Sequence, residues 1–191
     1  TVPHGNLTFT VMPAPGYKVD SVRVNGATVL PSEDGEYTIF VNGTVSIGVV
    51  ESPLVDVTLT TTITASGDKT YTIVVKTTPG EVSGNNNDIS VVGYGTLYSN
   101  QSFSSRELED QVMGIQLDNT LKETLLAQGS AKIYSYSQSV NFDLDELTNT
   151  FSYTFNNSSS TDRYGAGWIK LSDGKDSWIV FSDTVGPAGN P

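Results

Sequence analysis

Apolar and polar residues alternate along most of this chain, and glycine-containing turns interrupt the alternation at short intervals. Leu7, Phe9 and Val11 are separated by threonines, and such alternation places neighbouring side chains on opposite faces of a β-strand. The turns fall at four pairs of residues: Pro15-Gly16, Asn25-Gly26, Asp34-Gly35 and Asn42-Gly43. Because glycine and asparagine tolerate the positive φ of a type I′ turn, these pairs predict β-hairpins. Residues 1–52 are therefore expected to form a small domain of four or five strands.

Composition supports β-structure and narrows the classes of partner. Threonine, serine, asparagine and glycine are abundant, charged residues are 16% of the 191 residues, and the formal net charge is −11. Nucleic-acid binding needs clustered Lys and Arg, so we expect no nucleic-acid partner. The same charge disfavours anionic membranes, and no apolar run reaches the roughly 20 residues of a spanning helix. The chain has no cysteine, which excludes disulfides and leaves the redox compartment open.

A domain boundary is expected at Ser52-Pro53, where proline stops one phase of alternation before a new phase begins at Val55. Further strands are predicted at residues 55–65, 70–78, 89–98, 131–137, 149–155, 164–171 and 177–182. Turns or polar loops are predicted between them, at residues 66–68, 79–88, 156–162 and 172–176. The Pro/Gly-rich end, residues 186–191, predicts a linker to a further domain.

Between these strands lies the only helical signal. Ser104 and Glu107 have the spacing of a capping box, with apolar residues behind them at helical intervals. Thr120 and Glu123 repeat the spacing. The sequence predicts one or two short helices, with the stronger pattern at residues 117–128.

The first 50 residues also carry short motifs in a defined order: Gly16-Tyr17, Val24-Asn25-Gly26, Gly35-Glu36-Tyr37 and a closing Ile/Val strand. This order resembles the divergent internalin-B-type repeat of bacterial surface proteins over residues 5–51, although a single copy is present. Such repeats are small β-grasp-like units without catalytic residues, and they serve as spacers and adhesive stalks. The resemblance implies a structural role.

The sequences GYGTLYS at 93–99 and YGAGWIKLSDGKDSWIVFSD at 164–183 are similar to fibronectin-type-III-like or immunoglobulin-like sandwich domains of bacteria. A helical insert at 104–128 departs from that pattern. The expected fold class is therefore all-β. A β-grasp-like repeat domain at 1–52 would precede an immunoglobulin/fibronectin-III-like β-sandwich at 53–185.

Few residues could support catalysis. His4 is the only histidine and cysteine is absent, so a catalytic triad or a His/Cys zinc site lacks its side chains. A glycosidase needs two carboxylates about 5 to 10 Å apart. The candidates are Asp143, Asp145 and Glu146 in a turn-like stretch, and Glu107, Glu109 and Asp110 at a helix start. A solvated bend and the helix macrodipole explain both groups, and we expect no enzyme activity.

Three aromatic residues suggest a binding surface. Tyr164, Trp168 and Trp178 could form a platform that stacks on a sugar ring if they share an exposed face. Burial of these rings in the core of a sandwich is the alternative.

Calcium is the one candidate cofactor. The stretches DLDE and DGKD place Asp143 with Asp145 and Asp173 with Asp176, and hard cations prefer such clustered oxygens. Turn formation explains the same residues. An intramolecular isopeptide bond would need a buried lysine, an asparagine and an acid, and the candidates for the first two are Lys69, Lys76 and Asn149.

These features predict a non-catalytic structural or adhesive module of a secreted or cell-surface bacterial protein. The start at Thr1 without a signal peptide is typical of a piece of a longer protein. The expected partners are its other domains, with a host or cell-wall glycan or protein as a further candidate. The alternatives are a carbohydrate-binding module with an aromatic platform and an accessory domain of a secreted glycoside hydrolase.

Overall fold

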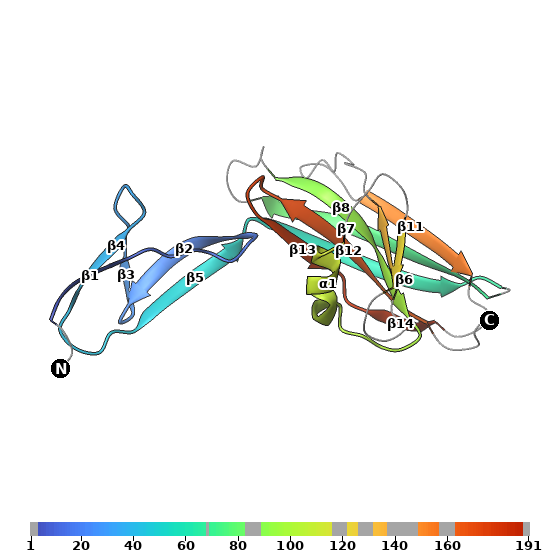
Figure 1. Cartoon of the computed structure of the whole chain (residues 1–191), viewed down its shortest axis with the longest axis horizontal. Coiled ribbons are helices and arrows are strands. Elements are labelled where there is room, and N and C mark those ends of the chain that lie inside the picture. Colours follow the sequence, from blue (N-terminus) through green and yellow to red (C-terminus); the bar gives the residue numbers. More distant parts are fainter. Residues whose placement is uncertain are drawn as a thin grey trace. The chain divides into compact units, whose positions relative to one another are not determined.

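A computed structural model divides the chain into two compact units, Thr1–Leu54 and Val55–Pro191. It describes residues 4–67, 69–82, 89–115, 122–125, 132–136, 149–156 and 163–188. Within these residues all paired strands are antiparallel, and helix is confined to one short segment of the second unit (Figure 1). The fold is all-β, as the alternation predicts, and it contains a short helical insertion. The division lies next to the expected boundary at Ser52-Pro53.

The first unit contains two small sheets. Its strands are β1 (Gly5–Phe9), β2 (Tyr17–Val24), β3 (Ala27–Val29), β4 (Tyr37–Val41) and β5 (Ile47–Pro53). β1 pairs with β4, and β2 lies between β3 and β5. Three of the described hydrophobic side chains here are buried, Val22, Tyr37 and Ile39. The core of this unit is therefore thin.

Of the hairpin turns predicted in this unit, the one at Asn25-Gly26 is confirmed and the one at Asn42-Gly43 is not. Asn25 and Gly26, between β2 and β3, have φ angles of 51° and 87°, which is the pair of positive angles that a type I′ turn requires. The hairpin predicted at Asn42-Gly43 is wrong, since neither residue has a positive φ. The reason is that β4 and β5 belong to different sheets and need no tight turn between them.

The second unit is a sandwich of two antiparallel sheets (Figure 1). Its strands are β6 (Val55–Ala65), β7 (Thr70–Val82), β8 (Ser90–Ser99), β9 (Lys122–Leu125), β10 (Lys132–Tyr136), β11 (Asn149–Asn156), β12 (Arg163–Ser172), β13 (Ser177–Phe181) and β14 (Val185–Ala188). The smaller sheet has the order β11-β7-β6. The larger sheet has the order β13-β12-β8-β10-β9, with β14 also paired to β12.

The main core lies between these two sheets, where β12 packs on β6 and β7. β6 alternates between buried and exposed side chains along most of its length, as a strand with one covered face should. The backbones approach closely because β12 turns two glycines toward the smaller sheet. A Cβ on Gly165 would lie 3.0 Å from Ile73 Cδ1, and a Cβ on Gly167 would overlap the side chain of Val75.

The helical insertion consists of a 3₁₀ turn, η1 (Ser105–Leu108), and a short helix, α1 (Glu109–Met113). The second helix predicted at 117–128 is wrong for residues 122–125, which form β9 and pair with β10. A helix this short is only marginally stable by itself. In β9 the backbone groups instead form hydrogen bonds with β10, and such tertiary pairing outweighs a weak preference of the local sequence for helix. The other residues of that segment lie outside the described part of the chain.

Two predicted irregular segments are partly strands. The polar loop expected at 79–88 begins later, because β7 continues along β6 until Val82 lies opposite Val55. The linker expected at 186–191 starts inside β14, where Ala188 lies opposite Arg163 of β12. A short strand paired on one side tolerates Gly and Pro. Residues 83–88 and 189–191 are outside the described part.

Candidate functional site

Trp168, the middle residue of the expected aromatic platform, lies inside the second unit. Its side chain is 0% exposed. It belongs to a cluster of buried apolar residues: Leu97, Leu108, Val112, Ala166 and Ile179. A buried indole cannot stack on a sugar, so the core interpretation holds for Trp168 and the three-ring platform is wrong.

The helical insertion covers Trp168 on the face of the larger sheet that points away from the smaller one. Leu108 of η1 and Val112 of α1 provide the apolar contacts. Lys170 Nζ donates a hydrogen bond to the carbonyl oxygen of Met113 at 3.3 Å, which fastens the end of α1 to β12. Because Leu108 and Val112 pack on Trp168, the insertion is part of the core. Within the described residues, the Nε1 atom of Trp168 has no hydrogen-bond acceptor.

Trp178 lies on the opposite face of the same sheet. In the β12–β13 register, Trp178 is opposite Leu171, whereas Trp168 is opposite Phe181. Because alternate residues point to opposite faces, Trp178 shares the face of Leu171 and not that of Trp168. Tyr164 is on the Trp168 side but is partly buried. The three rings do not form one surface.

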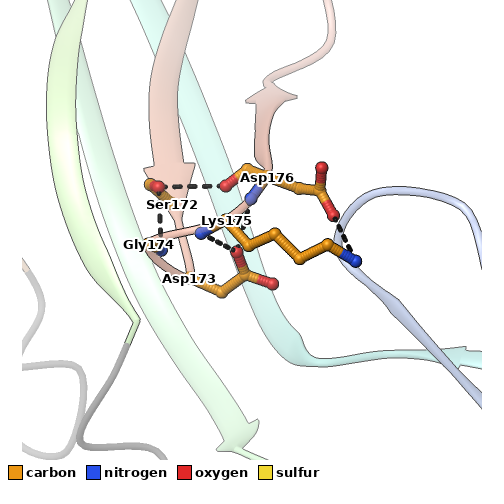
Figure 2. A network of polar contacts seen from close by, with 5 residues as sticks. All are labelled: Ser172, Asp173, Gly174, Lys175 and Asp176. Carbon is orange, nitrogen blue, oxygen red and sulfur yellow. Dashed lines mark hydrogen bonds and ion pairs between the residues drawn. The ribbon is translucent and has the colours of Figure 1, made fainter.

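Asp173 and Asp176 lie in the predicted hairpin turn between β12 and β13, which is confirmed (Figure 2). Asp173 Oδ1 accepts hydrogen bonds from the backbone N–H groups of Lys175 at 2.9 Å and Asp176 at 2.7 Å. Ser172 Oγ donates to the carbonyl oxygen of Asp176 at 2.9 Å. The hydrogen bond from the backbone N–H of Asp176 lowers the pKa of the Asp173 carboxyl below its usual value, and the bond from the N–H of Lys175 lowers it further by a smaller amount. The turn itself thus uses this carboxylate.

The structure does not gather calcium ligands in the residues it describes. The Asp176 carboxylate lies 3.9 Å from Lys175 Nζ, and nowhere in the described ranges do three Asp, Glu or His side chains come together as a metal site would need. Asp143, Asp145 and Glu146 lie outside those ranges. A calcium site at 143–146 stays a prediction.

The remaining charged candidates have structural positions. Glu107 lies in the first turn of η1, and Glu109 and Asp110 lie in the first turn of α1, where the partial positive charge of a helix start favours carboxylates. Lys69 and Lys76 are exposed. Neither is the buried lysine that an isopeptide bond requires.

One polar cluster was missed by the sequence analysis. Ser182 Oγ lies 2.6 Å from Thr61 Oγ1 of β6 and accepts a hydrogen bond from the backbone N–H of Gly167 at 2.9 Å. The carbonyl oxygen of Ser182 accepts one from Ser105 Oγ at 3.3 Å. This buried cluster joins both sheets to the helical insertion. In a chain rich in Ser and Thr, no local signal distinguishes these hydroxyls from exposed ones.

Arg163 was also missed, although it is among the largest buried side chains. Its guanidinium carbon lies 5.8 Å from the ring centroid of Tyr71, in cation–π geometry. Phe155 stacks on Tyr98 beside it, with centroids 4.1 Å apart. Phe155 also stacks on Tyr71, so Arg163 lies next to a row of three stacked rings.

The chain matches no protein-family model, no curated protein and no solved structure. None of the helices in the described part is long and apolar enough to cross a membrane. The two resemblances seen in the sequence therefore stay predictions.

Proposed function

We propose that this chain is a non-catalytic spacer and adhesive module of a secreted or cell-surface bacterial protein. The path of the chain through the second unit carries the proposal. A spacer domain takes the chain in at one end and releases it at the other, so that neighbouring domains are held apart.

The second unit has this arrangement. The chain enters at Val55, the first residue of β6, and leaves after Ala188. Ala188 pairs with Arg163, Arg163 lies over Tyr71, and Tyr71 pairs with Ala65 at the other end of β6. Entry and exit are therefore separated by the length of β6, an 11-residue strand, or about 36 Å.

The connection between the units is short. β5 ends at Pro53 and β6 begins at Val55, and the backbone N–H of Leu54 donates to the carbonyl oxygen of Gly16 at 2.8 Å. The linker between the two strands is therefore the single residue Leu54. The internalin-B-type resemblance of residues 5–51 and the fibronectin-III-like or immunoglobulin-like resemblance of the second unit support the same role and an extracellular bacterial location.

Single-molecule pulling between the two ends of the chain tests the spacer role. Tension applied at opposite ends of a sandwich shears its strands, so the second unit is expected to unfold in one step at high force. Its extension on unfolding should be about 450 Å, from roughly 3.6 Å per residue less the folded length.

The control uses a different pulling direction in the same protein. In Ser66→Cys, a handle attached beside Ala65 lies at the exit end, so pulling between residue 66 and the C-terminus peels strands apart and should require a much lower force. Equal low forces in both directions would overturn the spacer role. Labelling of intact source cells by an antibody to this chain tests the location, and staining only after lysis would refute it.

A further inference from the structure

β5 is an edge strand whose apolar side chains remain in solvent. Among the described residues it pairs with β2 alone. Ile47, Val49 and Val50 are 43%, 42% and 43% exposed, and they lie on both faces of the strand. Stable monomers usually protect such an edge with lysine, proline or a bulge. Here the protection is limited to Glu51, to Pro53 at the very end of β5, and to a register shift in the neighbouring strand β2 between Val19 and Ser21, which leaves β5 itself continuous.

We propose that β5 pairs with β5 of a second copy of this chain, antiparallel and centred on Val49, so that two three-stranded sheets become one six-stranded sheet. This inference goes beyond the spacer role, because it needs the first unit alone and does not depend on where the protein is located.

The direction of the peptide groups selects this register. The carbonyl oxygen of Ser46 and the N–H of Leu54 both form hydrogen bonds on the β2 side of the strand, each at 2.8 Å. Peptide groups alternate in direction along a strand. The odd-numbered residues between those two, Ile47, Val49 and Glu51, therefore point their N–H and C=O groups at the open edge.

Centring on Val49 lets all three of these residues exchange hydrogen bonds. Val49 then lies opposite itself, and Ile47 lies opposite Glu51. An axis one residue later would set Ile47 opposite Pro53, which has no N–H to donate. An axis one residue earlier would pair Glu51 with a residue before β5. The chosen register satisfies the most backbone groups.

The side chains fit the same register. Val50 would lie opposite Gly48, and no atom lies within 4 Å of where a Cβ on Gly48 would be. The existing pair of Val22 with Val49 would become a continuous apolar row across the new sheet. The two Glu51 carboxylates would lie at opposite ends of the paired strands, so like charges do not meet there even though each chain carries a net charge of −11.

The size of the contact indicates a weak dimer. A standard stable interface buries at least about 1,200 Å², and seven-residue strands joined at their edges bury less. We expect pairing at high micromolar concentration, or where many copies are displayed together and the effective concentration is high. Antiparallel pairing also directs the two chains beyond Pro53 toward opposite ends of the pair.

Single-cysteine variants test the register directly, because the chain has no cysteine. At the axis the two Cα atoms would be about 5.5 Å apart, within the range of a disulfide. Val49→Cys should therefore form a cross-linked dimer on mild oxidation. Ile47→Cys alone should not, since its copies would be about 13 Å apart along the strands. A mixture of Ile47→Cys and Glu51→Cys should cross-link.

Val92→Cys is the matched control, because Val92 is an exposed valine on a strand of the second unit. It should stay monomeric under the same oxidation. Equal cross-linking at Val49, Ile47 and Val92 would overturn the proposal.

Sedimentation of the cysteine-free protein gives an independent measurement. The apparent mass of the wild type should rise toward that of a dimer with concentration, and Val49→Lys should abolish the rise. Phe40→Lys changes another exposed residue of the first unit, on β4, and should leave the rise intact. A wild type that is monomeric at every concentration would overturn the inference, and so would a dimer lost with Phe40→Lys but not with Val49→Lys. Pulling forces on the second unit are unaffected by either result.

Discussion

The sequences of the two units alternate between apolar and polar residues in the same way, yet the apolar side chains are buried far more completely in the second unit than in the first. Strands of the first unit have three to eight residues and form two small sheets. The long strands of the second unit stack as two sheets, and the helical insertion covers a further face. Exposed large hydrophobic side chains gather in the first unit: Leu7, Met12, Tyr17, Leu30, Phe40, Ile47, Val49 and Val50. Alternation predicts a strand, whereas the depth of a core depends on what covers it.

This difference has a consequence for stability and for association. A unit of about 50 residues buries a smaller fraction of its surface than a larger one and is correspondingly marginal. The first unit should therefore unfold at a lower temperature than the second. Its uncovered edge at β5 can gain burial from another chain, while the second unit has already gained it within itself.

Removing the indole of Trp168 should have the largest effect on this contrast. Trp168→Ala is expected to cost the second unit about 3–5 kcal/mol, because it empties the space beneath the helical insertion. Trp178→Ala, at a partly exposed position, should cost clearly less. Denaturant unfolding followed by the remaining tryptophan measures both changes, since the chain has two tryptophans and both lie in this unit. Equal losses for the two variants would contradict the placement of Trp168.

Adding one methyl group between the sheets should have a smaller effect. A Cβ on Gly167 would overlap the side chain of Val75, so Gly167→Ala should destabilise the second unit by about 1–3 kcal/mol. The double variant with Val75→Ala should recover part of the loss. Gly43→Ala in the first unit should be almost neutral, because nothing lies within 4 Å of the added atom. Additive losses in the double variant would show that this contact does not set the sheet separation.

Strand positions were predictable where alternation and turn residues agree. β6 has the predicted bounds, Val55–Ala65, and the hairpin at 172–176 forms where Asp-Gly suggested it. β9 was not predictable, because its strand state depends on β10 and its own residues carry a helical pattern. Local sequence reports what a segment can do alone, and pairing partners decide between its options.

The candidate site was less predictable than the fold. The period-2 rule placed Tyr164 and Trp168 on one face correctly, but it could not say which face a helical insertion would cover. Nor could it find the contact between Thr61 and Ser182, which are 121 residues apart in the chain. Burial of a given face is a property of the assembled layers.

The smallest expected effect on stability comes from the turn after β12, where the exposed carboxylate of Asp173 accepts hydrogen bonds from the backbone of the turn and contacts no core. The pKa of Asp173 is lowered by backbone N–H groups, so the folded state prefers the charged form. The contribution of this carboxylate to stability is present above the usual pKa of 3.8 and is lost as the pH falls through the lower pKa of the folded state.

Asp173→Asn keeps an oxygen acceptor but removes the charge. Its melting temperature should be slightly below that of the wild type at pH 7, and the gap should close below about pH 3.8. Asp173→Ala, which also loses the acceptor, should remain below the wild type at both pH values. A gap for Asp173→Asn that widens on acidification would mean that the two backbone N–H groups do not favour the charged form of Asp173.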